Sequence, residues 1–208
     1  MSHRGYWKTP QEKNSRNAFE RSFSMGFGTE TDLRDYLGNI VISHDIANEE
    51  SIKGDSFFEI YSQYDPSLPL ALNVKADGLQ ANLKTLLERY NINNYFFFDM
   101  SIPDSLSYME HGLTFFSRQS EYELRPAFYD QCKGVWLDAF ESRWYDANLI
   151  SAHLEQGKQV AIVSPELHRR AAQPLWAYLR EQQLHTEAQI LLCTDLPEEA
   201  QQYFLNPE

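Results

Sequence analysis

The sequence is poor in cysteine and has no long apolar run. Its two cysteines, Cys132 and Cys193, are too few for a disulfide framework and too far apart for a local metal-binding pair, so a reducing cytosol is the expected compartment. The longest apolar runs, such as 95–98 and 190–193, fall far short of the ~20 residues that span a bilayer. The polar N-terminus also lacks the apolar stretch of a secretory signal. We therefore expect a cytoplasmic protein without an integral membrane segment.

Positive charge is also scarce. The chain has 18 Lys and Arg against 30 Asp and Glu, a formal net charge of −12, which argues against a sequence-independent nucleic-acid binder. What the sequence does contain is apolar material for a core, since 42% of its 208 residues are hydrophobic and 14% are aromatic. This length and composition predict one folded domain that spans residues 1–208.

Short apolar runs alternate with segments of helical spacing. Leu79, Leu83, Leu86 and Leu87 form the clearest apolar helical stripe. Further helices are predicted over 17–25, 104–110, 146–155 and 170–182. The predicted strands are 28–33, 39–43, 70–75, 95–99, 113–118, 134–138, 159–164 and 189–194. If the extreme N-terminus adds a first strand and 39–43 returns beside the second, eight strand–helix units result, which predicts an α/β fold of the compact (β/α)8 TIM-barrel type.

Polar residues cluster where the predicted strands end. Glu30 and Asp32 are two apart on one strand, so both carboxylates point to the same face and can meet one cation. Asn73 and Lys75 have the same spacing on the next strand. Further strands end in polar residues at His44, Asp45, Asp99, Arg118, Asp138, Ser164 and Asp195. Because the carboxyl ends of barrel strands share one rim, we expect these side chains to converge there.

The combination of side chains suits phosphate chemistry. A cation on the carboxylate pair, together with Arg4 and Lys75, would neutralise phosphoryl oxygens. His3 and His44 can serve as general base and general acid near neutral pH. Three of the four remaining histidines, at positions 111, 153 and 185, fall in helical or loop stretches and are predicted to be ordinary surface residues.

Several motifs resemble one known family, the glycerophosphodiester phosphodiesterase branch of the phosphatidylinositol-phospholipase-C-like barrels. They are HRG at 3–5, EKNS at 12–15, AF at 18–19, GTETD at 28–32 and VISHD at 41–45. Later in the chain, NVK at 73–75 is similar to the family's Glu-x-Lys, and CTDLP at 193–197 to its closing Thr-Asp-x-Pro. The resemblance therefore covers the whole chain, most specifically in its first 45 residues.

The resemblance implies a metal-dependent hydrolase that cleaves a glycerophosphodiester or a similar small polar phosphodiester. It assigns His3 and His44 to acid–base catalysis, and Arg4 and Lys75 to the phosphate. It assigns Glu30 and Asp32 to one divalent cation, Mg²⁺ or Ca²⁺. Glu12 matches a family glutamate that supports the first histidine or touches the metal. In many members a neighbouring hydroxyl of the substrate attacks the phosphorus, and the reaction passes through a cyclic phosphate.

The chain departs from the family pattern in three places. Asn73 stands where the family has an acidic metal ligand, which removes one negative charge and leaves Asp99 as a candidate to complete the metal shell. The insertion between the second and third strands is reduced to residues 46–70, and only Met1 and Ser2 precede His3. Specificity should therefore come from short loops at the strand ends.

Three alternatives stay open at this point. The enzyme could release the cyclic phosphate, as a phospholipase-C/D-like lyase does. The barrel could also be a catalytically weakened module that only binds a phosphorylated ligand. Arg118 is either a second phosphate or sugar contact, or one half of a salt bridge to Glu121 or Asp138.

Overall fold

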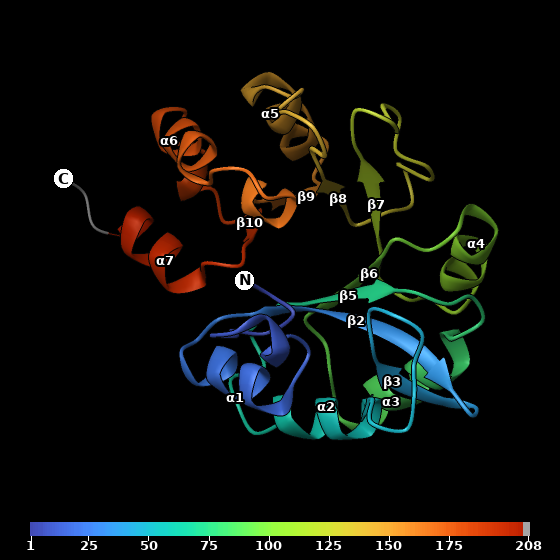
Figure 1. The fold of residues 1–208 in the computed structure, drawn as a ribbon. Coiled ribbons are helices and arrows are strands. Elements are labelled where there is room, and N and C mark those ends of the chain that lie inside the picture. The colour runs from blue at the N-terminus through green and yellow to red at the C-terminus, as the bar shows by residue number, and fades with distance from the viewer. Residues whose placement is uncertain (206–208) are drawn as a thin grey trace. The chain divides into compact units, whose positions relative to one another are not determined.

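The computed structural model describes residues 1–205, and the chain divides into two compact units. The N-terminal unit is Ser2–Phe115. The C-terminal unit combines Met1 with the chain from Phe116 onward. Each unit contains one sheet and its own helices (Figure 1).

The N-terminal unit is built on a six-stranded sheet. Its strands are β1 (Ser2–His3), β2 (Thr29–Tyr36), β3 (Asn39–Ile42), β4 (Ile52–Lys53), β5 (Leu70–Val74) and β6 (Tyr95–Phe98). The order is β4-β3-β2-β5-β6, with β1 also paired to β2. β1, β2, β5 and β6 are parallel, whereas β3 turns back antiparallel along the far half of β2. On the edge of the sheet, Phe97 of β6 forms a parallel bridge with Phe115.

Four helices accompany this sheet: α1 (Arg16–Ser24), α2 (Gly54–Tyr61), α3 (Gln80–Arg89) and α4 (Ile102–Glu110). Figure 1 shows α1, α2 and α3 on the same side of β2 and β5. Aromatic side chains join α1 to α2, since Phe57 meets Phe19 edge to face with ring centroids 4.7 Å apart and also packs on Phe23. These rings are buried, so the aromatic content noted in the sequence forms the core of this unit.

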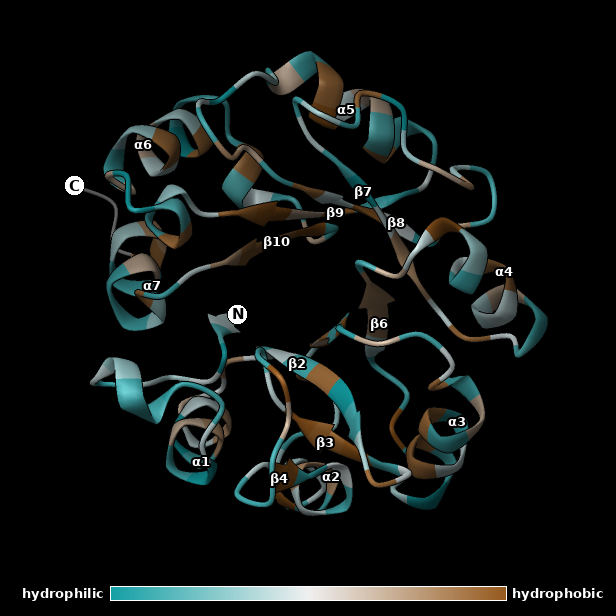
Figure 2. Cartoon of the chain, turned by 45° about the vertical axis from the view of Figure 1, so that its right-hand side comes forward, coloured by the Kyte–Doolittle hydropathy of each residue, from teal (hydrophilic) through white to brown (hydrophobic). Residues whose placement is uncertain are grey.

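The C-terminal unit has a four-stranded parallel sheet in the order β10-β9-β8-β7. The strands are β7 (Phe116–Gln119), β8 (Gly134–Leu137), β9 (Gln159–Val163) and β10 (Ile190–Cys193). The helices are α5 (Ala147–Glu155), α6 (Gln173–Glu181) and α7 (Pro197–Leu205). In Figure 2 the apolar strands β9 and β10 are coloured brown, whereas much of β2 in the other unit is pale or teal. Met1 extends this sheet, because its amine donates to the carbonyl of Leu192 and its carbonyl accepts from the amide of Thr194.

The predicted strands are confirmed to within a few residues, and 39–43 does return beside the second strand. The prediction of eight strand–helix units is wrong at β7, because the connection from β7 to β8 contains no α-helix. β4, α2 and α7 were not predicted. The eight parallel strands are divided between two sheets, and neither sheet of the described chain closes on itself. The fold is therefore α/β. None of the helices in residues 1–205 is long and apolar enough to cross a membrane.

The prediction that His153 lies on the surface is wrong. Its side chain is buried in the C-terminal unit, where Nε2 is 2.8 Å from Oε1 of Gln119 and Nδ1 is 2.7 Å from the hydroxyl of Tyr129. Burial lowers the pKa of this histidine, and the nearby charge of Lys158 lowers it further. His153 therefore serves as a neutral hydrogen-bonding link between α5 and β7.

We expect this burial to make the fold sensitive to acid. A histidine with a lowered pKa binds fewer protons in the folded chain than in the unfolded chain, so its contribution to stability is lost as the pH falls below about 6.5. His153→Gln removes the titrating group. Thermal melts at several pH values should show a smaller loss of stability between neutral and mildly acidic pH in the variant. Equal losses in the two proteins would contradict this role.

Candidate active site

The strand register places four of the predicted residues next to one another in the N-terminal unit. His3 of β1 pairs with Glu30 of β2, and Asp32 of β2 pairs with Asn73 of β5. Glu30 and Asp32 are both buried, two residues apart on the same strand. They lie in the half of β2 that pairs with β5, before β2 continues into its hairpin with β3. The predicted convergence is thus present within this unit.

Asp32 is surrounded by groups that neutralise its charge. Its Oδ2 lies 3.0 Å from Nε of Arg4 and accepts a hydrogen bond of 2.8 Å from the amide of Asn14. Its Oδ1 is 3.4 Å from Nζ of Lys75. Both cations that the sequence assigned to phosphate therefore lie beside this carboxylate, where their charge offsets the cost of its burial.

Glu30 has a different environment. Its Oε2 accepts from the backbone amide of Arg4 at 3.2 Å and lies 3.9 Å from Nε2 of His3. Burial and then the neighbouring charge of Asp32 raise the pKa of Glu30 well above its usual range, although Arg4 and Lys75 act in the opposite direction. Further positive charge beside Glu30 would act in the same direction as Arg4 and Lys75 and favour its charged form.

A tight turn after β1 directs Arg4 to this pair. Arg4 has a φ of 59° and Gly5 a φ of 78°, so both lie in the left-handed region. A side chain at Gly5 would also bring a Cβ within 2.8 Å of the backbone of Ala18, so only glycine fits. The amide of Gly5 donates to the hydroxyl of Thr29 at 3.0 Å. The backbone geometry of the turn thus explains the glycine of the HRG motif. The charge that the turn brings to the carboxylate pair explains its arginine.

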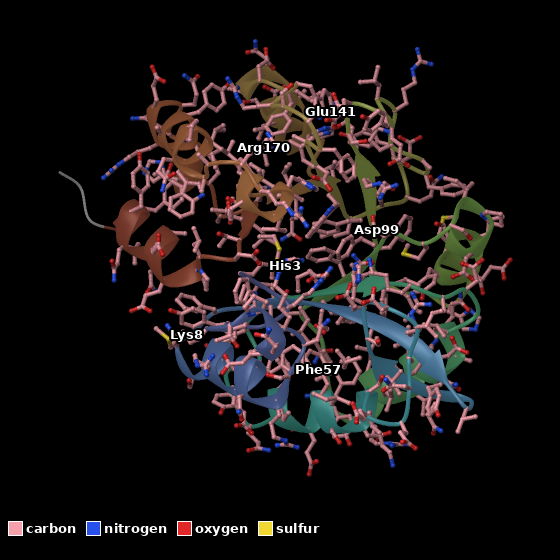
Figure 3. The ribbon with its side chains drawn as sticks, in the orientation of Figure 1. His3, Lys8, Phe57, Asp99, Glu141 and Arg170 are labelled. Carbon is pink, nitrogen blue, oxygen red and sulfur yellow. The ribbon has the colours of Figure 1, made fainter. Side chains whose placement is uncertain are left out.

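Asn73 provides an oxygen that has no hydrogen bond. Its Nδ2 donates to Oδ2 of Asp99 at 3.1 Å, while its buried Oδ1 has no partner in the described part of the chain. Asp99 follows β6 with a φ of 64°. His3 and Asp99 are both labelled in Figure 3. Asp99 therefore fixes the orientation of the amide, and Oδ1 is the atom left to accept another ligand.

These donors fit a hard divalent cation. Two carboxylates, Glu30 and Asp32, and the unpartnered amide oxygen of Asn73 are oxygen ligands of the kind that Mg²⁺ and Ca²⁺ take. Within residues 1–205, no group of three or more His, Cys, Asp or Glu side chains is arranged to hold a metal. The candidate set is therefore two carboxylates and an amide, with less negative charge than a three-carboxylate site.

His44 lies in the wall of a pocket that also reaches Arg4. This pocket of about 460 Å³ lies between the loop after β1 and the loop between β3 and β4. Lys13 and Asn14 contribute to its lining. The side chain of His44 is 45% exposed, and its Nδ1 is 2.9 Å from Oδ1 of Asp45. That hydrogen bond, followed by the charge of His44, lowers the pKa of Asp45.

Two further predicted residues have other contacts. Oε2 of Glu12 accepts from the backbone amide of Lys8 and from Arg21, each at 2.8 Å, so it organises the loop that follows His3. Arg118 belongs to the C-terminal unit, where its Nε bonds to Glu123. Of the two alternatives for Arg118, one was a salt bridge to Glu121 or Asp138; the carboxylate that it meets is instead that of Glu123.

Asn14 is a site residue whose role was not predicted. Its amide donates to Asp32, and its Oδ1 accepts a hydrogen bond of 2.9 Å from the hydroxyl of Thr31. Its φ of 57° lies in the left-handed region that asparagine tolerates better than most residues. The sequence offered two signals for this position: Asn14 belongs to the EKNS motif, and it directly precedes Ser15, the N-cap of α1.

The comparisons with known proteins concern structure. No family model and no curated protein matches the sequence. A protein from Galdieria sulphuraria assigned as a glycerophosphodiester phosphodiesterase is 18% identical, with a TM-score of 0.77 over 99% of this chain and 96% of the other. An Oleispira antarctica phosphodiesterase in complex with its product sn-glycerol-3-phosphate is 15% identical, with a TM-score of 0.73 and the same coverage.

The glycerophosphodiester phosphodiesterase from Agrobacterium tumefaciens is 13% identical, with a TM-score of 0.69 over 93% of this chain and 94% of the other. These matches span nearly the full length of both partners, so the likeness concerns the whole chain and not one motif. The chain therefore has an α/β fold similar to that of the glycerophosphodiester phosphodiesterases, the family that its motifs resemble.

Proposed function

We propose that this chain is a metal-dependent phosphodiesterase that hydrolyses a glycerophosphodiester or a similar small polar phosphodiester. The observation that carries the proposal is the buried pair Glu30 and Asp32, with Arg4, Lys75 and the unpartnered oxygen of Asn73 around it. A buried cluster of this kind is costly for folding and is typical of a functional site. The fold shared with glycerophosphodiester phosphodiesterases, one of them bound to glycerol 3-phosphate, supports the same conclusion.

Each residue has a role in this proposal. Arg4 and Lys75 stabilise negative charge on the phosphoryl oxygens, because their cationic groups already lie at the edge of the carboxylate pair. His3 and His44 transfer protons as the phosphorus–oxygen bond is formed and broken. Glu12 supports the loop that follows His3. Arg118 remains a candidate second contact for phosphate or sugar.

Glu30, Asp32 and Oδ1 of Asn73 would hold one Mg²⁺ or Ca²⁺, with Asp99 keeping the amide in place. When bound, the cation supplies positive charge that polarises the phosphoryl group. Its charge would also oppose the two effects that raise the pKa of Glu30, which are first its burial and then the neighbouring charge of Asp32. The substitution of an amide for a carboxylate predicts weaker cation binding than at a site with three carboxylates.

The proposal includes a single closed barrel of the TIM-barrel type over residues 1–208, in which the connection from β7 to β8 lacks an α-helix. Two contacts within the separate units support it. Phe115, which directly precedes β7, pairs with Phe97 of β6, and Met1, which directly precedes β1, bonds to Leu192 and Thr194 beside β10. We also propose a cytoplasmic location, for which the support is that the two buried cysteines, Cys132 and Cys193, are not joined in a disulfide.

A screen of purified protein against glycerophosphodiesters and sugar-phosphate diesters tests the function. We expect release of a phosphomonoester from at least one diester in the presence of Mg²⁺ or Ca²⁺, and loss of turnover in a chelator. A wild-type protein that leaves the whole panel intact with either cation would contradict the proposal.

One observation favours a second candidate, a module that binds a phosphorylated ligand without cleaving it. Asp32 already has two cationic neighbours and Asn73 carries no charge, so the net negative charge available to a cation is small. Calorimetry distinguishes the two functions. Weak cation sites in proteins have dissociation constants of up to about millimolar. Heat of binding for Mg²⁺ or Ca²⁺ in this range supports the enzyme. No heat with either cation favours the module.

A further inference from the structure

Lys13, in the loop after β1, lies between two anchored residues of the N-terminal unit. Before it, Glu12 accepts two hydrogen bonds of 2.8 Å that fix the short 3-10 helix that this residue ends. After it, the backbone amide of Asn14 donates to the carbonyl of Arg4 at 2.9 Å, and its side chain donates to Asp32 at 2.8 Å. The backbone of Lys13 is therefore held in place by its neighbours on both sides.

The side chain of Lys13 is positioned as well. Its ammonium group lies over the indole ring of Trp7, 4.5 Å from the ring centroid, which is a cation–π contact. The indole Nε1 donates to the carbonyl of His3 at 3.1 Å, so the ring is tied to the strand that carries the first histidine. Lys13 and Trp7 are both half-buried. A charge that is already held in place loses less conformational freedom when it binds a ligand.

Lys13 lines the same pocket as Arg4 and His44. Its volume of about 460 Å³ falls within the range of small-molecule sites, roughly 300–1,000 Å³, so it can hold an alcohol group of a small diester as well as its phosphate. Arg4 connects the pocket to the carboxylate pair, because its Nε is 3.0 Å from Oδ2 of Asp32. One pocket of the N-terminal unit therefore contains both Lys13 and the arginine to which we assign the phosphate.

The lining of this pocket contains charges of both signs. Two carboxylates, Asp45 and Glu50, belong to it, but both are exposed, so solvent and salt screen their effect on a ligand. Asp45 also bonds to His44, which offsets part of its charge when the imidazole is protonated. The cations of the lining are Arg4 and Lys13. Because the proposed function already assigns Arg4 to the phosphate that is cleaved, Lys13 is the lining cation that still lacks a role.

We propose that Lys13 determines substrate specificity, and that the preferred substrates are glycerophosphodiesters in which one alcohol carries a second anionic group, a phosphate or a carboxylate. The inference rests on the proposed function and names its substrate class. The lysine ammonium is a compact charge that donates charge-assisted hydrogen bonds to such oxygens. Trp7 holds this charge at the wall of the pocket. Lys13 takes no part in proton transfer, so its contribution is to binding and appears in kcat/KM.

The test compares three diesters of glycerol 3-phosphate, whose second alcohol is glycerol, glyceric acid or another glycerol 3-phosphate. These alcohols have the same carbon skeleton and differ in charge. In the wild type, kcat/KM should be about tenfold or more higher for the phosphorylated diester than for the neutral one, the usual effect of one charge-assisted hydrogen bond. Lys13→Gln should bring this ratio close to one, and Lys13→Arg should retain most of it. A gain on the phosphorylated diester alone assigns the contact to phosphate, and a gain on both charged diesters assigns it to anions in general.

Lys8→Gln is the matched control. Lys8, labelled in Figure 3, lies in the same loop with its ammonium 4.0 Å from the ring centroid of Tyr6, but it is not among the described residues that line the pocket. This variant should keep the wild-type ratio. A wild-type protein without preference for a charged diester, a Lys13→Gln protein with the wild-type ratio, or an equal loss on all three diesters would overturn the inference alone. A wild-type protein that cleaves none of them would overturn the proposed function too. Thermal melts verify that each variant is folded.

Discussion

His44→Ala lowers kcat by a factor of about 10² or more on the best diester, the usual contribution of a general acid or base. His44 is half exposed and contacts Asp45 on the surface, so the free energy of unfolding should change by less than about 0.5 kcal/mol. Steady-state kinetics with thermal melts measure both quantities.

His111→Ala is the matched control for this variant. His111 is a half-buried histidine at the end of α4, where Nδ1 bonds to the carbonyl of Ser107, and it belongs to no part of the proposed site. Its kcat should match that of the wild type. A purified, folded His44→Ala protein that retains most of the wild-type rate would remove His44 from the mechanism, whereas His3 and the carboxylate pair would still have to be tested.

Glu30→Gln abolishes the stabilisation of the fold by Mg²⁺ or Ca²⁺ and lowers kcat by a factor of about 10² or more, since the charge supplied by the cation is worth several kcal/mol in the transition state. In the wild type, a cation at about ten times its Kd should raise the free energy of unfolding by about 1.4 kcal/mol. For a domain of this size that corresponds to a rise in Tm of roughly 3–6 °C.

Glu20→Gln is the matched control for Glu30→Gln. Glu20 is an exposed residue of α1 that pairs with Arg16, so its loss should leave both the cation-dependent rise in Tm and the turnover unchanged. If the Glu30→Gln protein shows the same rise in Tm as the wild type, the cation binds elsewhere and the assignment of the carboxylate pair is wrong.

Much of the fold could be predicted because most buried strands are short apolar runs. Glu30 and Asp32 stand out as two carboxylates in the buried half of β2. The helix α2 was missed because it begins at Gly54 after Lys53, without a capping side chain to announce it. The helix α7 begins with the residues typical of a helix start, Pro197 followed by two glutamates in the first turn, but it was not predicted.

The site was predictable only where its residues are close in sequence or carry a motif. The residues of HRG and GTETD meet through the pairing of β1 with β2, and the family resemblance had assigned residues of both motifs to one site. By contrast, the partner of His168 is Asp138, and the partner of His153 is Gln119, each 30 or more positions away. One sequence contains no signal for such pairs, because they form only when separate strand ends are brought together by the sheet.

The most direct test of the account is a phosphorus NMR spectrum of a glycerophosphodiester incubated with the purified wild-type protein and Mg²⁺ or Ca²⁺. The account predicts that the diester signal is replaced by the signal of a phosphomonoester, and that a chelator prevents the change. A diester signal that persists with both cations would contradict the account. A cyclic phosphate that accumulates as the final product would contradict hydrolysis and indicate a lyase.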